Sequence, residues 1–134
     1  MNAMMNSYQQ YKKHDVMMAN PMELIIMLYN GAIKQLRLAK MSIEEDKPET
    51  ANAKLQKAQD IIMELMMGLD LSYQIGQDLL KLYEYIHNQI MEINITKQLD
   101  SIDAVVEMLS ELRDAWVQVH NESKGSIYAG QEAE

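Results

Sequence analysis

The stretch Pro21-Met-Glu-Leu-Ile-Ile-Met-Leu-Tyr-Asn-Gly-Ala32 opens the first predicted helix of this 134-residue chain, which covers residues 20–44. The Asn20 side chain is suited to cap the helix, and Pro21 fits the first helical position because its missing N–H would have no partner there. Glu23 places a carboxylate beside the free N–H groups and the positive end of the helix dipole. Behind this start, apolar residues recur in steps of three and four and form one face, which comprises Met22, Ile25, Tyr29, Ala32, Leu36, Ala39 and Ile43.

The first turns of this helix carry more apolar residues than one core-facing side needs. Leu24, Ile26, Met27 and Leu28 are apolar too. At about 3.6 residues per turn, several of them lie roughly a quarter turn or more from the core-facing side. Large exposed apolar patches usually mark interaction sites, so this surplus is the starting point of the functional interpretation.

Composition favours one soluble helical domain and excludes several functions. Hydrophobic residues make up 48% of the chain, and the net charge is −8. An acidic chain without a basic stripe is a poor binder of nucleic acid and of anionic membrane surfaces. The chain has no cysteine, which excludes disulfides, thiolate chemistry and cysteine metal sites. No secretory signal or membrane-spanning stretch is visible, so we expect a cytoplasmic protein.

Three further helices are predicted at residues 48–69, 76–96 and 101–121. Pro48 suits the start of the first of these, and Asp100 or Ser101 is expected to cap the last. Their apolar faces comprise Ala51, Leu55, Ala58, Ile62, Leu65 and Leu69; Leu79, Tyr83, Ile86, Ile90 and Ile93; and Ile102, Val105, Leu109, Leu112, Trp116 and Val119.

Four helices of similar length with short connections predict an all-α fold, an antiparallel up-down four-helix bundle over residues 20–121. Residues 1–19 form a Met-rich leader or cap segment, and residues 122–134 are expected to be a flexible tail. The first helix is net positive and the last is net negative, which suits neighbouring helices.

No residue pattern predicts catalysis or a cofactor. Glu84 and His87 form one Glu-x-x-His step, but a carboxylate-bridged metal pair in a helical bundle needs a second step and two further inward glutamates. His120 lies in a terminal region without matched spacing. No serine has a placed histidine and acid, and no glycine-rich phosphate loop is present. We therefore expect no enzyme activity, no metal and no cofactor.

Apolar residues beside or beyond the core-facing sides are the candidate binding surface. One interpretation is that wide apolar stripes simply enlarge the core. The other is a groove that accepts an amphipathic segment of a partner. The thirteen methionines suit such an adaptable surface, although Met also fills gaps in cores. The candidates within the helices are Leu24, Met27, Leu28, Ile61, Met63, Met67, Leu80, Leu82, Tyr85 and Met108.

Several stretches of the chain form a recognisable series when taken in order. They are a leader with Tyr8 and Tyr11, Ala19-Asn-Pro21, Leu24-Ile-Ile-Met-Leu-Tyr-Asn-Gly-Ala-Ile33, Ala58-Gln-Asp-Ile-Ile62, Leu79-Leu-Lys-Leu-Tyr-Glu-Tyr-Ile86 and Leu112-Arg-Asp-Ala-Trp116. In this order and spacing they resemble the FliS family of flagellar export chaperones. The family often has a paired glycine before the third helix, where this chain has only Gly76.

The resemblance implies a cytoplasmic chaperone that binds the disordered C-terminal segment of flagellin, prevents premature polymerisation and supports delivery to the type III export gate. It also implies that the leader covers part of the apolar surface, which places Tyr8 and Tyr11 in that cover. A structural helical adaptor for a folded partner remains the alternative. A regulatory antagonist, the identity of the flagellin and self-association of the free protein are left open by the sequence.

Overall fold

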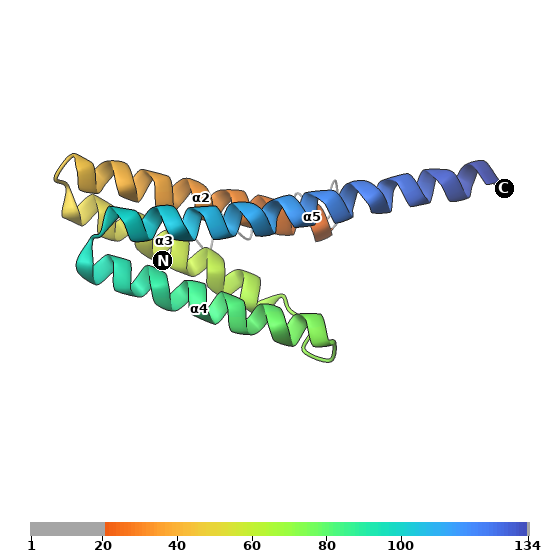
Figure 1. The fold of residues 1–134 in the computed structure, drawn as a ribbon, viewed down its shortest axis with the longest axis horizontal. Coiled ribbons are helices and arrows are strands. Elements are labelled where there is room, and N and C mark those ends of the chain that lie inside the picture. The colour runs from red at the N-terminus through yellow and green to blue at the C-terminus, as the bar shows by residue number, and fades with distance from the viewer. Residues whose placement is uncertain (1–20, 134) are drawn as a thin grey trace.

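The structure is a computed structural model that describes the backbone of residues 21–133 and the side chains as far as Ser123. The described residues form four helices, α2 (Pro21–Glu44), α3 (Pro48–Met67), α4 (Gln74–Thr96) and α5 (Leu99–Ala133). Consecutive helices run in opposite directions (Figure 1), as predicted for an antiparallel up-down bundle. The expected cap Asn20 and the leader with Tyr8 and Tyr11 lie outside the described residues.

The core is built from the predicted apolar faces. Tyr29 and Leu36 of α2, Leu55 and Ile62 of α3, and Ile90 of α4 are among the fully buried side chains. Ile33 and Ile61 are also buried, although neither lies on a predicted core-facing side. Val119 departs in the opposite direction, because its side chain is 47% exposed where a core residue was expected. His120 is buried beside it, so the buried side of α5 continues from Trp116 by a step of four.

Most helix boundaries lie within two residues of those predicted. Pro48 begins α3, as expected from its fixed backbone angle. Asp100 and Ser101 are not caps, since α5 already begins at Leu99. Lys97 ends α4 in the left-handed conformation, with φ 57°. The chain turns sharply at this residue, and only a short connection separates α4 from α5. The last helix continues past residue 121 to Ala133. The flexibility of residues 122–134 stays a prediction.

The four helices pack unequally. α2 packs closely on α3 and α5, and α3 packs on α4, whereas α4 and α5 make the fewest contacts of the neighbouring pairs. Figure 1 shows α4 diverging from α5 toward the α3–α4 connection. One side of the bundle, between α4 and α5, is therefore less closed than the other three.

Candidate binding surface

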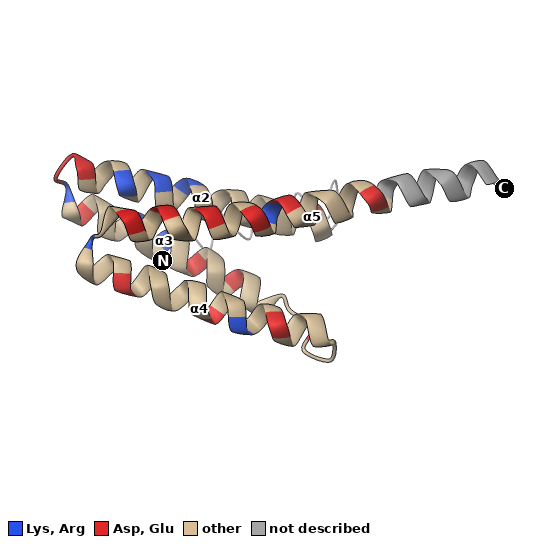
Figure 2. Cartoon of the chain, in the orientation of Figure 1, with Lys and Arg blue, Asp and Glu red and all other residues tan. Residues whose placement is uncertain are grey.

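Polar contacts fix which edge of each helix faces which neighbour. Lys40 Nζ of α2 donates to Asp103 Oδ1 of α5 at 2.9 Å, and Arg113 Nη1 donates to Asn30 Oδ1 at 3.0 Å. The Asp103 carboxylate raises the pKa of the Lys40 ammonium through the hydrogen bond between them. Figure 2 shows the basic residues of α2 beside the acidic residues of α5, the opposite charges predicted for neighbouring helices. These contacts define the α2-facing edge of α5.

A third contact joins α2 to α5. His120 Nε2 lies 3.1 Å from Glu23 Oε1, and the histidine is almost fully buried. From the sequence, His120 was expected to be a terminal histidine without matched spacing. The step of four from Trp116 was the available signal, because it continues the buried side of α5.

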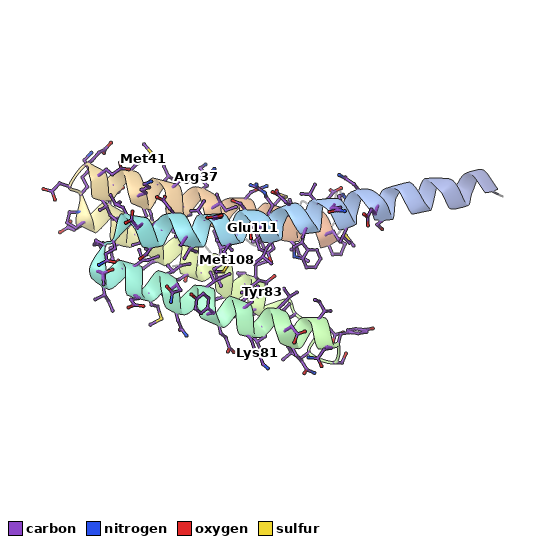
Figure 3. The ribbon with its side chains drawn as sticks, in the orientation of Figure 1. Arg37, Met41, Lys81, Tyr83, Met108 and Glu111 are labelled. Carbon is purple, nitrogen blue, oxygen red and sulfur yellow. The ribbon has the colours of Figure 1, made fainter. Side chains whose placement is uncertain are left out.

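The opposite edge of α5 carries Met108. On a helix with about 100° between residues, Met108 lies roughly 140° from both Asp103 and Arg113. Its side chain is half-buried and packs against the core. Met108 and Tyr83 are labelled in Figure 3 where α4 and α5 separate, whereas Arg37 and Met41 lie on the outer side of α2. Met108 therefore belongs to the loosely closed α4–α5 side.

Leu82 and Tyr85 lie on the same side of the bundle, from α4. Asn94 Nδ2 donates to Asn52 Oδ1 of α3 at 2.6 Å, which marks the α3-facing edge of α4. Leu82 and Tyr85 lie roughly 120° and 180° away from Asn94 around the helix. Leu82 packs against the core, and Tyr85 is 51% exposed. On α5, Leu112 and Val119 lie roughly 40° and 20° from Met108 around the helix. We call the set Leu82, Tyr85, Met108, Leu112 and Val119 the α4–α5 surface.

The other predicted binding residues lie elsewhere. Leu80 is within roughly 40° of Asn94, which puts it on the α3-facing edge of α4. Leu24 and Leu28 are half-buried on α2, on the side of Gly31, whose hydrogen faces Ile61. Met27 is half-buried farther round the same helix. Ile61 itself is 5% exposed and part of the core, which corrects the expectation that it is surplus to the core.

An apolar group at the α3–α4 connection was, apart from Met67, not predicted from the sequence. Met67, Leu71, Tyr73 and Ile75 are all exposed there. The connection is well ordered by hydrogen bonds, because Asp70 Oδ1 accepts from both the backbone N–H and the hydroxyl of Ser72. These two bonds lower the pKa of the Asp70 carboxyl. The available signal was the presence of three apolar residues, Leu71, Tyr73 and Ile75, in a predicted connection.

Beneath the α4–α5 surface lies a polar cluster inside the core. The hydroxyl oxygens of Tyr29 and Tyr83 are 2.5 Å apart, and their rings meet edge to face with centroids 6.2 Å apart. Burial raises the pKa of both tyrosines, and a hydrogen bond with the Trp116 indole opposes the rise. The indole nitrogen carries one N–H and can only donate. Trp116 was predicted as a core aromatic, and it packs half-buried against the core.

Neither a metal centre nor a membrane span is found in the part of the chain that the structure describes. Within residues 21–123, no three histidine or acidic side chains are grouped as metal ligands. Glu84 is exposed and His87 is half-buried, so they do not point jointly into the core. No helix of the described residues combines the length and hydrophobicity that crossing a bilayer requires.

Comparison with known proteins identifies the family. Residues 4–123 match the family model for the flagellar protein FliS. The flagellar secretion chaperone FliS of Bacillus subtilis (strain 168) is 36% identical over 116 residues, which cover 87% of each chain. The corresponding chaperone of Vibrio cholerae is 32% identical over 122 residues, covering 87% of this chain and 90% of the relative.

A solved structure agrees with both sequence matches. The crystal structure of a flagellar chaperone from bacteria superposes with a TM-score of 0.72 at 28% identity, and it covers 88% of this chain and 98% of the other. The antiparallel helical bundle predicted from the sequence is thus the fold of a known flagellar chaperone. The chain belongs to the FliS family of flagellar proteins.

Proposed function

We propose that this protein is a cytoplasmic chaperone that binds the disordered C-terminal segment of flagellin, prevents its premature polymerisation and supports its delivery to the flagellar type III export gate. Family membership supports the chaperone role, since the curated relatives are flagellar secretion chaperones. The observation that carries the binding mode is the α4–α5 surface. There, apolar side chains remain partly exposed between the two neighbouring helices that pack least on each other.

An amphipathic helix would complete this side of the bundle. Such a segment lays apolar residues spaced i, i+3, i+4 and i+7 into a groove between helices. Leu82, Met108 and Leu112 offer an apolar floor that already packs on the core, and Tyr85 and Val119 offer exposed rims. A segment that folds on binding typically buries about 1,000–3,000 Å² and loses roughly 2–5 kcal/mol to ordering. Leu24, Met27, Leu28 and Leu80 would extend the contact if the segment wraps around the bundle.

Truncating one exposed rim residue tests this surface. We expect Tyr85→Ala to weaken binding of a synthetic peptide with the C-terminal segment of flagellin by roughly tenfold, because aromatic anchors carry much of the energy of interfaces. Met91→Ala is the matched control, since Met91 is 46% exposed on the same helix but roughly 120° from Tyr85. Titration calorimetry measures both. Equal affinities for the two variants would place the peptide elsewhere.

The leader is proposed to compete with the segment for apolar surface. On this proposal, replacing Tyr8 and Tyr11 by Ala weakens the cover, so the flagellin peptide binds more tightly or faster. Calorimetry and stopped-flow mixing measure affinity and rate. Unchanged values for both would reject the cover. If the two tyrosines instead contact the export gate, peptide binding would survive and secretion of flagellin would fail.

The same titrations separate the chaperone from the structural adaptor. An adaptor would bind a folded partner and ignore the unfolded C-terminal peptide. A chaperone binds the peptide and shows no turnover. An export-gate component and a regulatory antagonist are further proposed partners. Self-association of the free protein is a separate question, and sedimentation in the same buffer measures it.

A further inference from the structure

The Tyr29–Tyr83 contact joins two helices that are not neighbours in the bundle. α2 packs on α3 and α5, and α4 packs on α3. The two hydroxyls meet through the core, and Trp116 brings α5 to the same point. Three helices thus share one polar cluster, next to the α4–α5 surface and on the half of α4 nearer the α3–α4 connection.

Polar contacts fix the position of α4 in a way that apolar contacts do not. Hydrophobic attraction has no preferred direction, whereas a hydrogen bond weakens steeply with distance and angle. Both hydroxyls are buried, so moving α4 away from α2 would break their mutual hydrogen bond inside the core. Toward its other end, α4 is held to α3 by the Asn52–Asn94 hydrogen bond. The helix is therefore attached at two polar points.

We propose that the Tyr29–Tyr83–Trp116 cluster is a positioning latch that sets how far α4 stands from α5, and so determines which helical segment fits the α4–α5 surface. The proposal rests on the proposed function for the identity of the segment. The positioning of α4 does not depend on it. Without the latch, α4 keeps its apolar contacts but samples a range of distances, and the surface accepts segments of different width with less discrimination.

Three variants test the latch. Tyr83→Phe removes one hydroxyl and leaves that of Tyr29 buried without its tyrosine partner. Tyr29→Phe together with Tyr83→Phe removes both hydroxyls and restores an apolar match. Ile102→Val is the stability control, because Ile102 is fully buried at the start of α5, away from the cluster. Each protein is studied by amide hydrogen exchange and by the fluorescence of Trp116, the one tryptophan in the chain.

Each protein is also titrated with two peptides, the C-terminal segment of flagellin and a scrambled amphipathic sequence of the same composition. We expect Tyr83→Phe to accelerate exchange in α4 about fivefold more than in α2 or α3, and to reduce the preference for the flagellin peptide about fivefold. The double variant should recover stability but keep the reduced preference. Ile102→Val should lose stability with an unchanged preference.

A preference that follows stability across all variants would overturn the proposal, because the cluster would then only hold the core together. Exchange that rises equally in α2, α3 and α4 would overturn it too. If Tyr83→Phe does not fold, Trp116→Phe removes the indole donor and is judged by hydrogen exchange in α4 and by the preference between the two peptides. A wild-type protein that binds neither peptide refutes the proposed function and the selectivity it would explain, while the exchange pattern still decides whether the cluster positions α4.

Discussion

Gly76 leaves no room for a side chain at the start of α4. A Cβ at this position would lie 2.1 Å from the Asp70 carbonyl oxygen, which belongs to the backbone of the α3–α4 connection. We expect Gly76→Ala to lower the free energy of unfolding by about 1–3 kcal/mol, even though alanine favours helix over glycine. The connection or the first turn of α4 would have to shift. Urea unfolding followed by circular dichroism measures the loss.

Gly31→Ala is the matched control for this prediction. Its Cβ would lie 3.4 Å from Ile61 Cδ1, an ordinary contact with the end of a side chain. Within α2, alanine should therefore leave the free energy of unfolding unchanged or raise it by up to about 1 kcal/mol. Equal effects of the two substitutions on the free energy of unfolding would contradict the prediction, because the Asp70 carbonyl would then shift without destabilising the protein.

The tyrosine cluster predicts alkaline unfolding. The unperturbed tyrosine pKa is 10.0, and burial raises the pKa of Tyr29 and of Tyr83 above it. Their contribution to stability is complete below pH 10. Above it the unfolded chain loses these protons while the folded chain keeps them, so stability falls as the pH rises toward the folded pKa. The expected slope is about 1.4 kcal/mol per pH unit for each tyrosine.

Unfolding at pH 9 and pH 11 measures this slope, and the double variant Tyr29→Phe with Tyr83→Phe is the comparison. The two proteins differ only in these two hydroxyls, so the difference between their stabilities isolates the tyrosines. Parallel loss of stability in the two proteins would contradict the account.

Individual residues were predictable from the sequence where periodicity alone decides burial. Tyr29, Tyr83 and Leu109 were placed in the core correctly. Ile61 was misplaced because α2 presents Gly31 to it, and the missing side chain lets Ile61 fill the space between the helices. The meeting of two tyrosine hydroxyls was also missed, since the pattern of one helix does not reveal which residue of a distant helix lies opposite.

At the scale of the helices, α5 differs most from expectation. Figure 1 shows its C-terminal part extending beyond the ends of the other three helices. Gly125 and Gly130 suggested an earlier end, but glycine only weakens a helix, and no proline follows. The number of helices and the start of α3 were predictable because prolines and apolar periods are local signals.

Removing residues 124–134 tests what this extension contributes. We expect the truncated protein to keep its melting temperature to within about 2 °C, because the backbone extends beyond the ends of the other helices and an isolated helix segment adds little stability in water. Thermal unfolding and peptide titration check stability and binding together. A lower melting temperature would reveal packing on the bundle, and a loss of affinity alone would reveal a contact with the partner.

At the scale of the whole molecule, the unequal packing of the bundle is the property on which the proposed function rests. Periodicity predicted four buried faces, and the structure confirms the bundle. The periodicity could not predict that α4 would pack on α3 and separate from α5, because a buried face does not reveal how closely the neighbouring helices approach it. For the same reason the predicted binding residues divide between the α4–α5 surface, the edges of α2, the α3-facing edge of α4 and the core.

The central claim is that a foreign helical segment covers the apolar surface that the bundle leaves open between α4 and α5. The most direct test is a calorimetric titration with flagellin and with flagellin lacking its C-terminal segment, repeated at several temperatures. The account predicts binding of the intact subunit with a negative heat-capacity change, the signature of apolar burial, and no binding of the truncated one. Equal binding of both proteins, or binding without that heat-capacity change, would contradict it.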